Sequence, residues 1–378
     1  MSHTDEKRFR YDSVLEAADI CNLKRERIRL LQGLAKREKM VVYGRRNSGK
    51  TSVVMSIVIP KFQATHKKSF CMFCDFMEVK NKESIDLRMH TEFQNAFSKT
   101  FPAKTLLSSI SKYLKGLRPN ISIDNLTGQP SLSLVTVPGE ILDFTKILAL
   151  VRENIAPHIP TLMVFDEFQD VALVPEAQGL FRKELQTLSA SIIIMGSKRH
   201  LLSNMFSKPN APFADFGSDI EFGFISYKEY HSYIEERFAA RRLKISLDSA
   251  VLWQDLLNRN PEAVNIVGDR IVSRYENITI GEKHIKDSIA SVLEERRGRF
   301  EQLLGLLGVS EEKVLIAVAK HGPVKQPSGK SFLRFVNLTH ATVMKVVGYL
   351  LDHGFLEYAE QGYRLTNPLL AYYLRSFR

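Results

Sequence analysis

Short apolar runs alternate with longer stretches of helical spacing over the first half of the chain. The apolar runs predict buried strands at 40–43, 69–76, 161–165 and 191–195. Apolar residues at helical spacing predict helices at 20–38, 51–59, 83–99, 103–117, 140–155 and 175–189. We expect the helix that starts at residue 51 to stop at Pro60, because proline lacks the N–H that a helix needs. Strands that alternate with helices indicate a parallel sheet covered on both faces.

The pattern changes in three later or inserted segments. Two β-type stretches, 121–124 and 132–137, flank Gly128-Gln129-Pro130 and predict a hairpin insert near 118–138. From about 226 to 305 only helices are expected. The last segment predicts helices at 311–320, near 329–336 and from the N-cap Thr339 to about His353, then two short strands around Gln361-Gly362. Three helices followed by a hairpin predict a winged helix.

Composition narrows the class of protein without selecting a partner. The chain has 378 residues, which indicates two or three domains, and its 44% hydrophobic and 25% charged residues are those of an ordinary soluble protein. It has no run of about 18 apolar residues, and residues 1–10 lack the apolar stretch of a secretory signal. We therefore expect a cytoplasmic protein with no membrane partner. The net charge of +11 permits a nucleotide, a nucleic acid or an anionic surface as partner.

The chain has three cysteines, which fits a reducing compartment. Cys71 and Cys74 form a C-x-x-C, a pattern that occurs in metal-binding and redox sites. They lie in a predicted strand, where residues three apart point to opposite faces. We therefore expect a structural pair and no metal or redox site.

Residues 44–51 match the phosphate-binding pattern G-x-x-x-x-G-K-[ST], between a predicted strand and a predicted helix. Gly44 and Gly49 let the backbone wrap around phosphate oxygens, with N–H groups pointing inward at the start of the helix. Lys50 is expected to reach the β- and γ-phosphates of ATP, and the Thr51 hydroxyl to ligate Mg²⁺. The expected nucleotide-binding residues are Gly44, Arg45, Arg46, Asn47, Ser48, Gly49, Lys50, Thr51 and Ser52. The fold class is therefore α/β, with the parallel sheet of a P-loop NTPase.

Polar residues also follow two other predicted strands. Asp166 is expected to hold Mg²⁺ through water, and Glu167 beside it to polarise the attacking water. Ser197 either contacts the γ-phosphate or water, or only caps a turn. Ligands of open α/β sheets lie beyond the carboxyl ends of the strands, so we expect Gly44, Asp166 and Ser197 to meet there. The expected catalytic residues are Lys50, Glu167 and Ser197.

Asp166-Glu167-Phe168-Gln169, preceded by four apolar residues, resembles the D-E-F-Q motif of the archaeal-type ATPase family, among the STAND and AAA+-related P-loop ATPases. Among the matching features, the P-loop and this motif are the specific ones. Looser matches are Lys24-Arg25-Glu26, Gly44-Arg45-Arg46, Gly196-Ser197, Met205-Phe206, Ala211-Pro212-Phe213 and Asn260-Pro261. The resemblance covers about residues 22–375.

The resemblance implies a sheet with the sensor strand between the two nucleotide-binding strands, an AAA+-like core, a helical lid and a C-terminal winged helix. It also implies ATP binding with slow or regulated hydrolysis. With the pattern above, it divides the chain into a flexible lead-in at 1–17, a P-loop ATPase core at 18–225, a helical lid at 226–308 and a winged helix at 309–378.

One departure from the family pattern concerns an arginine. Members commonly carry a Gly-Arg pair whose arginine approaches the nucleotide, whereas this chain has Phe216-Gly217-Ser218-Asp219. An arginine finger contributes about 10³–10⁵ in rate, so either hydrolysis is weak or another residue supplies the charge. The candidates are Arg237, Arg241 and Arg242.

The winged helix leaves two classes of partner open. Its third helix carries His340, Thr342 and Lys345 at positions expected to be exposed, with Lys325, Lys330 and Arg334 upstream and Arg364 in the wing. This is a modest basic surface for DNA. One hypothesis is an ATP-driven switch or motor acting on DNA through 309–378, and the other is a regulatory ATPase whose winged helix binds a protein. A nucleotide-dependent homo-oligomer is compatible with both.

Overall fold

The computed structural model describes residues 7–101, 141–197, 205–206, 210–359 and 361–378, and the backbone of 119–123 and 130–134. Contacts divide the chain into two compact units. The core unit contains Lys24–Arg45 and Lys50–Phe222. The C-terminal unit contains residues 7–23, Arg46–Gly49 and Gly223–Arg378.

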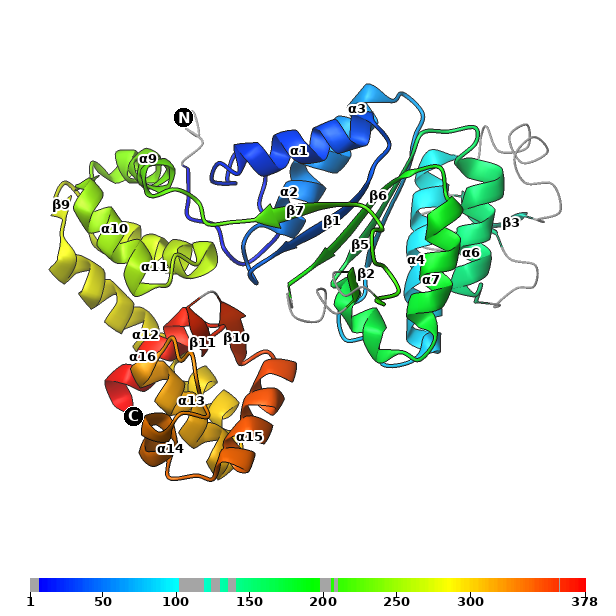
Figure 1. Ribbon diagram of the computed structural model, residues 1–378. Coiled ribbons are helices and arrows are strands. Elements are labelled where there is room, and N and C mark those ends of the chain that lie inside the picture. The colour runs from blue at the N-terminus through cyan, green and yellow to red at the C-terminus, as the bar shows by residue number, and fades with distance from the viewer. Residues whose placement is uncertain are drawn as a thin grey trace. The chain divides into compact units, whose positions relative to one another are not determined.

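A five-stranded sheet forms the centre of the core unit (Figure 1). Its strands are β1 (Lys39–Gly44), β2 (Phe70–Asp75), β5 (Thr161–Asp166), β6 (Ser191–Gly196) and β7 (Ser218–Phe222). The order is β2-β5-β6-β1-β7, and every pairing is parallel. Every residue of β5 and β6 is buried, as continuous apolar runs in a covered parallel sheet should be. The sensor strand β6 lies between β1 and β5, which confirms the expected topology.

Helices cover both faces of this sheet. They are α1 (Lys24–Ala35), α2 (Lys50–Val53), α3 (Ile59–Thr65), α4 (Lys82–Thr100), α6 (Phe144–Leu150) and α7 (Ala177–Thr187), with π-helical turns η1 (Val54–Val58) and η2 (Val151–Ile155) and the 3₁₀ turn η3 (Phe168–Leu173). The helices α4, α6 and α7 pack on the face that carries Met163 and Phe165. Figure 1 shows α1, α2 and α3 on the opposite face. There Gly33 of α1 lies so close to Met40 that an added Cβ would meet its sulfur at 2.2 Å.

The expected stop at Pro60 is wrong. The helical path continues through η1 into α3, where Pro60 lies in the first turn. The N–H of Ile59 bonds to the carbonyl of Val54, five residues back, so the hydrogen-bond register shifts just before the proline. Proline is tolerated in a first turn, where an N–H is not required. A sequence rule for isolated helices does not anticipate this shift.

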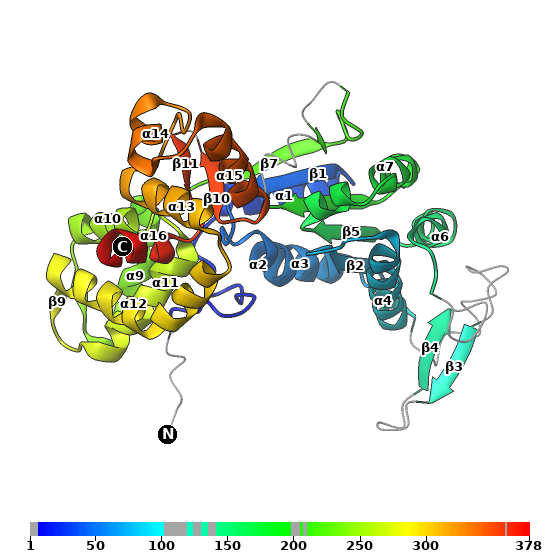
Figure 2. The same ribbon diagram turned by 90° about the horizontal axis from the view of Figure 1, so that it is seen from below.

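Two strands pair within the region of the predicted hairpin, each starting two residues before its predicted position. β3 (Pro119–Ile123) pairs antiparallel with β4 (Pro130–Leu134), with Ile121 opposite Leu132, and Figure 2 shows the two strands side by side. The helix predicted at 103–117 lies outside the described residues.

Strand β7 was not predicted. It forms the edge beside β1, with Val41 opposite Asp219. Gly217 precedes it, and a Cβ there would lie 2.2 Å from the carbonyl oxygen of Lys39. This glycine therefore allows a close backbone approach. Ser218, which follows Gly217 in the stretch that departs from the family pattern, is the first residue of the strand.

The C-terminal unit is mainly helical. Its first part contains α9 (Tyr227–Phe238), the 3₁₀ turn η4 (Ala239–Arg241), α10 (Leu247–Leu256), α11 (Pro261–Arg274) and α12 (Glu282–Gly305). The N-caps Ser226, Ser246 and Asn260 accept backbone hydrogen bonds that begin their helices. A short parallel pair, β8 (Lys244–Ile245) with β9 (Thr279–Ile280), departs from the helices-only prediction.

The predicted winged-helix elements are present. They are α13 (Val309–His321), α14 (Lys330–Val336), α15 (His340–Asp352), β10 (Leu356–Ala359) and β11 (Gly362–Leu365). Thr339 is the N-cap of α15, as expected, and its hydroxyl accepts a hydrogen bond from the Thr342 N–H at 3.3 Å. A further helix, α16 (Pro368–Phe377), was not predicted, although Asn367-Pro368 before an apolar run is a start signal.

The expectation of a flexible lead-in is wrong for residues 7–17. Phe9 is 3% exposed and packs on Tyr233, Phe238 and Trp253 of the C-terminal unit. Gly268 of α11 makes room for it, since a Cβ there would lie 2.6 Å from the Phe9 ring. No helix of the described residues is long and apolar enough to cross a membrane.

Candidate nucleotide site

The P-loop combines a turned backbone with an enclosed lysine. Asn47 and Gly49 have φ values of 59° and 88°, the left-handed conformation that a tight phosphate loop requires. Lys50 is 5% exposed, and its Nζ donates to the carbonyl oxygens of Gly44 at 3.1 Å and Arg45 at 2.9 Å. The ammonium group thus lies against the loop backbone that precedes it.

The other predicted loop residues differ in exposure. Ser48 and Ser52 are buried, with 8% of each residue exposed, whereas Arg46 and Asn47 are exposed. Arg45 is half-buried.

Thr51 and Asp166 meet, as the sequence predicted. The Thr51 hydroxyl donates to Asp166 Oδ2 at 2.6 Å. Burial raises the pKa of the Asp166 carboxyl, the negative charge of Glu167 adds to this, and the hydrogen bond from Thr51 opposes it. A hydroxyl and a carboxylate side by side are oxygen donors of the kind Mg²⁺ prefers, so these two residues fit the ion.

Glu167 is held by its neighbours. It has a left-handed φ of 47°, and its N–H donates to Asp166 Oδ1 at 2.9 Å. Ser197 Oγ donates to Glu167 Oε2 at 2.9 Å, and the Gln169 side-chain amide donates to the same oxygen. Ser197 therefore contacts the expected catalytic carboxylate. Gln169 was predicted only as the last letter of D-E-F-Q, and that motif is the signal that could have assigned it to the site.

C-x-x-C lies on β2 as expected, with Cys74 buried and Cys71 half-buried. Burial raises the pKa of the Cys71 thiol to about 11 and raises that of Cys74 further.

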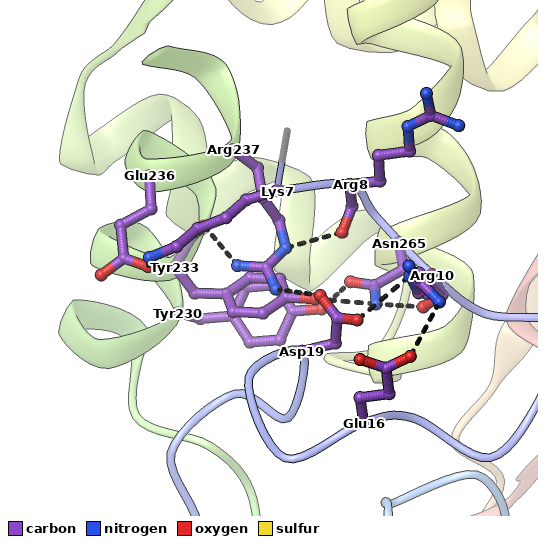
Figure 3. A network of polar contacts seen from close by, with 10 residues as sticks. All are labelled: Lys7, Arg8, Arg10, Glu16, Asp19, Tyr230, Tyr233, Glu236, Arg237 and Asn265. Atoms are coloured by element: carbon purple, nitrogen blue, oxygen red, sulfur yellow. Dashed lines mark hydrogen bonds and ion pairs between the residues drawn. The ribbon is translucent and has the colours of Figure 1, made fainter. Parts of the chain in front are cut away.

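Of the candidate arginines, Arg237 is already engaged. It is 1% exposed, and its guanidinium donates to Asp19 Oδ1 at 3.2 Å and to the carbonyl of Arg8 at 2.9 Å (Figure 3). The guanidinium carbon also lies 3.4 Å from the Tyr233 ring centroid. Arg241 and Arg242 are exposed. Arg237 thus fastens the N-terminal segment and is unsuited to act as a finger.

The winged helix carries an acid-free segment. Between Glu312 and Asp352 the sequence has no Asp or Glu. Its six cations, all exposed, are Lys313, Lys320, Lys325, Lys330, Arg334 and Lys345. None of them forms an ion pair with another described residue. These cations form the basic surface of α13, α14, α15 and, at Lys325, the loop between α13 and α14.

The wing contributes less charge than predicted. Arg364 Nε pairs with Glu357 Oε1 at 2.7 Å across β10 and β11. Thr342 is half-buried, so His340 and Lys345 are the exposed polar residues among those predicted on α15.

The fold consists of an α/β core around a parallel five-stranded sheet and a C-terminal winged helix, and solved proteins share it. Residues 298–376 match the family model described as a probable winged helix domain. The chain is similar to the Walker-type ATPase PABY2304 of Pyrococcus abyssi, with a TM-score of 0.66, 15% identity, and coverage of 97% of this chain and 99% of that one. It is also similar to the Aeropyrum pernix ORC2 protein in its ADPNP–ADP complexes, with a TM-score of 0.56, 15% identity, and coverage of 99% and 96%. No curated protein matches the sequence.

Proposed function

We propose that this chain binds Mg²⁺–ATP at Gly44–Ser52 and hydrolyses it to ADP and phosphate. The observation that carries the proposal is the hydrogen bond between Thr51 and Asp166, next to an enclosed Lys50. Lys50 exchanges its backbone acceptors for β- and γ-phosphate oxygens. Thr51 would ligate Mg²⁺ and Asp166 would hold it through water, and the ion would neutralise charge on the phosphates. Glu167 takes the proton of the attacking water.

Turnover by the isolated chain is expected to be slow. Ser218 lies in the stretch that departs from the family's Gly-Arg pattern, and Arg237 is enclosed by Asp19 and Tyr233. Arg241, Arg242 or a second copy of the chain would have to supply the missing positive charge. Phosphate release measured over a range of protein concentrations tests this. If a second copy of the chain supplies the positive charge, the rate of hydrolysis per chain rises with protein concentration.

We propose that ATP drives a switch or motor that acts on DNA through residues 309–378, with 226–308 as the lid. The acid-free basic segment of α13, α14 and α15 supports this, since unpaired cations bind phosphates. Titration of duplex DNA at several salt concentrations tests it. Contacts with Z phosphates give a log–log slope of about −0.9Z, and the absence of binding at low salt excludes the proposal.

A second candidate is a regulatory ATPase whose winged helix binds a protein. Its support is the exposure of large apolar side chains on α14 and α15: Phe335 is 50% exposed, Met344 40% and Tyr349 38%. Light scattering and pull-down with and without ATP test it, and they also report a nucleotide-dependent homo-oligomer. Unchanged mass and unchanged partner binding exclude this candidate.

A further inference from the structure

The Gln169 side chain lies between two carboxylates. It is 1% exposed in η3, and its Nε2 donates to Glu167 Oε2 and, at 3.4 Å, to Asp170 Oδ1. Asp170 Oδ2 in turn accepts the backbone N–H of Glu78, beyond β2, at 2.8 Å. Both amide hydrogens are therefore directed at acidic groups.

These contacts fix which way the amide points. A reversed amide would place Gln169 Oε1 against the two carboxylates, where acceptors repel. In the orientation observed, Oε1 is buried and accepts no hydrogen bond from any described residue. An unsatisfied buried acceptor costs about 1–3 kcal/mol. The side chain is therefore held by the two hydrogen bonds of Nε2, while Oε1 is left without a hydrogen-bond donor among the described residues.

The consequence falls on Glu167. Gln169 and Ser197 both donate to its Oε2, so one oxygen of the carboxylate is anchored twice. Across the described part of the chain, no donor reaches the other oxygen, Oε1. A carboxylate anchored through one oxygen presents the second in a fixed direction.

We propose that Gln169 is a positioning residue that aims Glu167 Oε1 at the attacking water. This rests on the ATP hydrolysis proposed above. The water oxygen bonds to the γ-phosphorus while its proton passes to Glu167 Oε1. The bond from the γ-phosphorus to the β–γ bridging oxygen breaks, and ADP leaves with that electron pair. Gln169 contacts neither water nor phosphate in this role.

Two substitutions test the role of the amide nitrogen. Gln169→Glu keeps the size and shape of the side chain but replaces the donor with an acceptor, and Gln169→Met removes both polar atoms. We expect either change to lower kcat about 10- to 100-fold, the range seen when a partner that orients a functional side chain is lost. The affinity for Mg²⁺–ATP in calorimetry should change by less than about twofold, because Gln169 does not contact the nucleotide. Gln254→Met is the matched control, since it removes another buried amide, which donates to the Ala250 carbonyl at 3.0 Å in α10. We expect its kcat to match the wild type.

A double-mutant comparison separates positioning from packing. If Gln169 acts through Glu167, Gln169→Met should cause no further loss in a Glu167→Gln chain, whose residual turnover is followed over hours. Three results would overturn the inference. The first is a wild-type kcat in Gln169→Glu, and the second is a loss of ATP affinity in a Gln169 variant that parallels its loss of kcat. The third is a double variant in which the losses of kcat from Gln169→Met and Glu167→Gln add in full. A wild-type chain that releases no phosphate overturns the proposed hydrolysis itself.

Discussion

Lys50 is a charged side chain that is almost fully enclosed, and its acceptors are backbone carbonyls of the same loop. A buried ammonium group is tolerated when hydrogen bonds satisfy it. These acceptors lie within six residues of Lys50, so the local sequence supplies them. The group is thus held at the loop that is proposed to bind phosphates.

Lys50→Ala should abolish measurable ATP binding. Hydrogen bonds to charged groups contribute about 1.5–3 kcal/mol each. Losing the two that Lys50 is proposed to make with the β- and γ-phosphates therefore lowers the affinity for ATP by more than about 100-fold. Isothermal titration calorimetry with Mg²⁺–ATP measures it, with the exposed Lys36→Ala as control. Wild-type affinity in the Lys50 variant would show that the site assignment is wrong.

Glu167→Gln should keep ATP binding and lose turnover. Gln cannot accept the proton of water, and general bases typically contribute about 10²–10⁴ in rate. Phosphate release and calorimetry on the same preparation separate the two effects. Glu176→Gln, at an exposed position just before α7, is the control. If the Glu167 variant hydrolyses ATP at the wild-type rate, another residue is the base.

At the scale of elements, the basic surface depends on one stretch of sequence, between Glu312 of α13 and Asp352 of α15, that has no acidic residue. The hairpin after it behaves differently, because Arg364 is neutralised by Glu357 on the paired strand. Helix propensity and charge along one segment are visible in the sequence. Pairing across two strands depends on their register.

The triple variant Lys330→Ala, Arg334→Ala and Lys345→Ala should weaken DNA binding and flatten its salt dependence. Each lost phosphate contact lowers the magnitude of the log–log slope by about 0.9. The control removes as many charges from α12, with Lys283→Ala, Lys286→Ala and Arg297→Ala. Equal slopes in the two triple variants would exclude this surface as the DNA contact and favour the protein partner.

At the scale of the whole molecule, the N-terminal segment is part of the C-terminal unit. Arg237 joins α9 to Asp19, while Asn265 of α11 donates to the carbonyl of Arg10 at 2.7 Å (Figure 3). Burial raises the pKa of nearby Tyr233 to about 12, so this phenol stays neutral at physiological pH. Residues before the P-loop therefore stabilise a unit formed mostly after residue 222.

Asp19→Ala should destabilise the C-terminal unit by about 3–5 kcal/mol, because it leaves the buried Arg237 charge without its partner. Trp253 is the only tryptophan, is fully buried and lies 6.1 Å from Phe9 between ring centroids. Its fluorescence during urea unfolding therefore reports on this unit.

The double variant Asp19→Ala with Arg237→Met should recover part of the lost stability, since it removes the uncompensated charge. A single variant that unfolds at the wild-type urea concentration would contradict a structural role for the pair.

The sequence by itself determined the P-loop, the D-E-F-Q strand end, the order of most strands and helices, and the winged helix. These features rest on neighbouring residues and on hydrophobic periodicity, both of which a single chain displays. The tertiary structure alone decided that Asp19 meets Arg237, 218 residues away, that β7 joins the sheet edge, and that Gln169 lies between Glu167 and Asp170. Such contacts depend on how distant segments pack and on which side chains then face each other. Local propensity predicts neither of these.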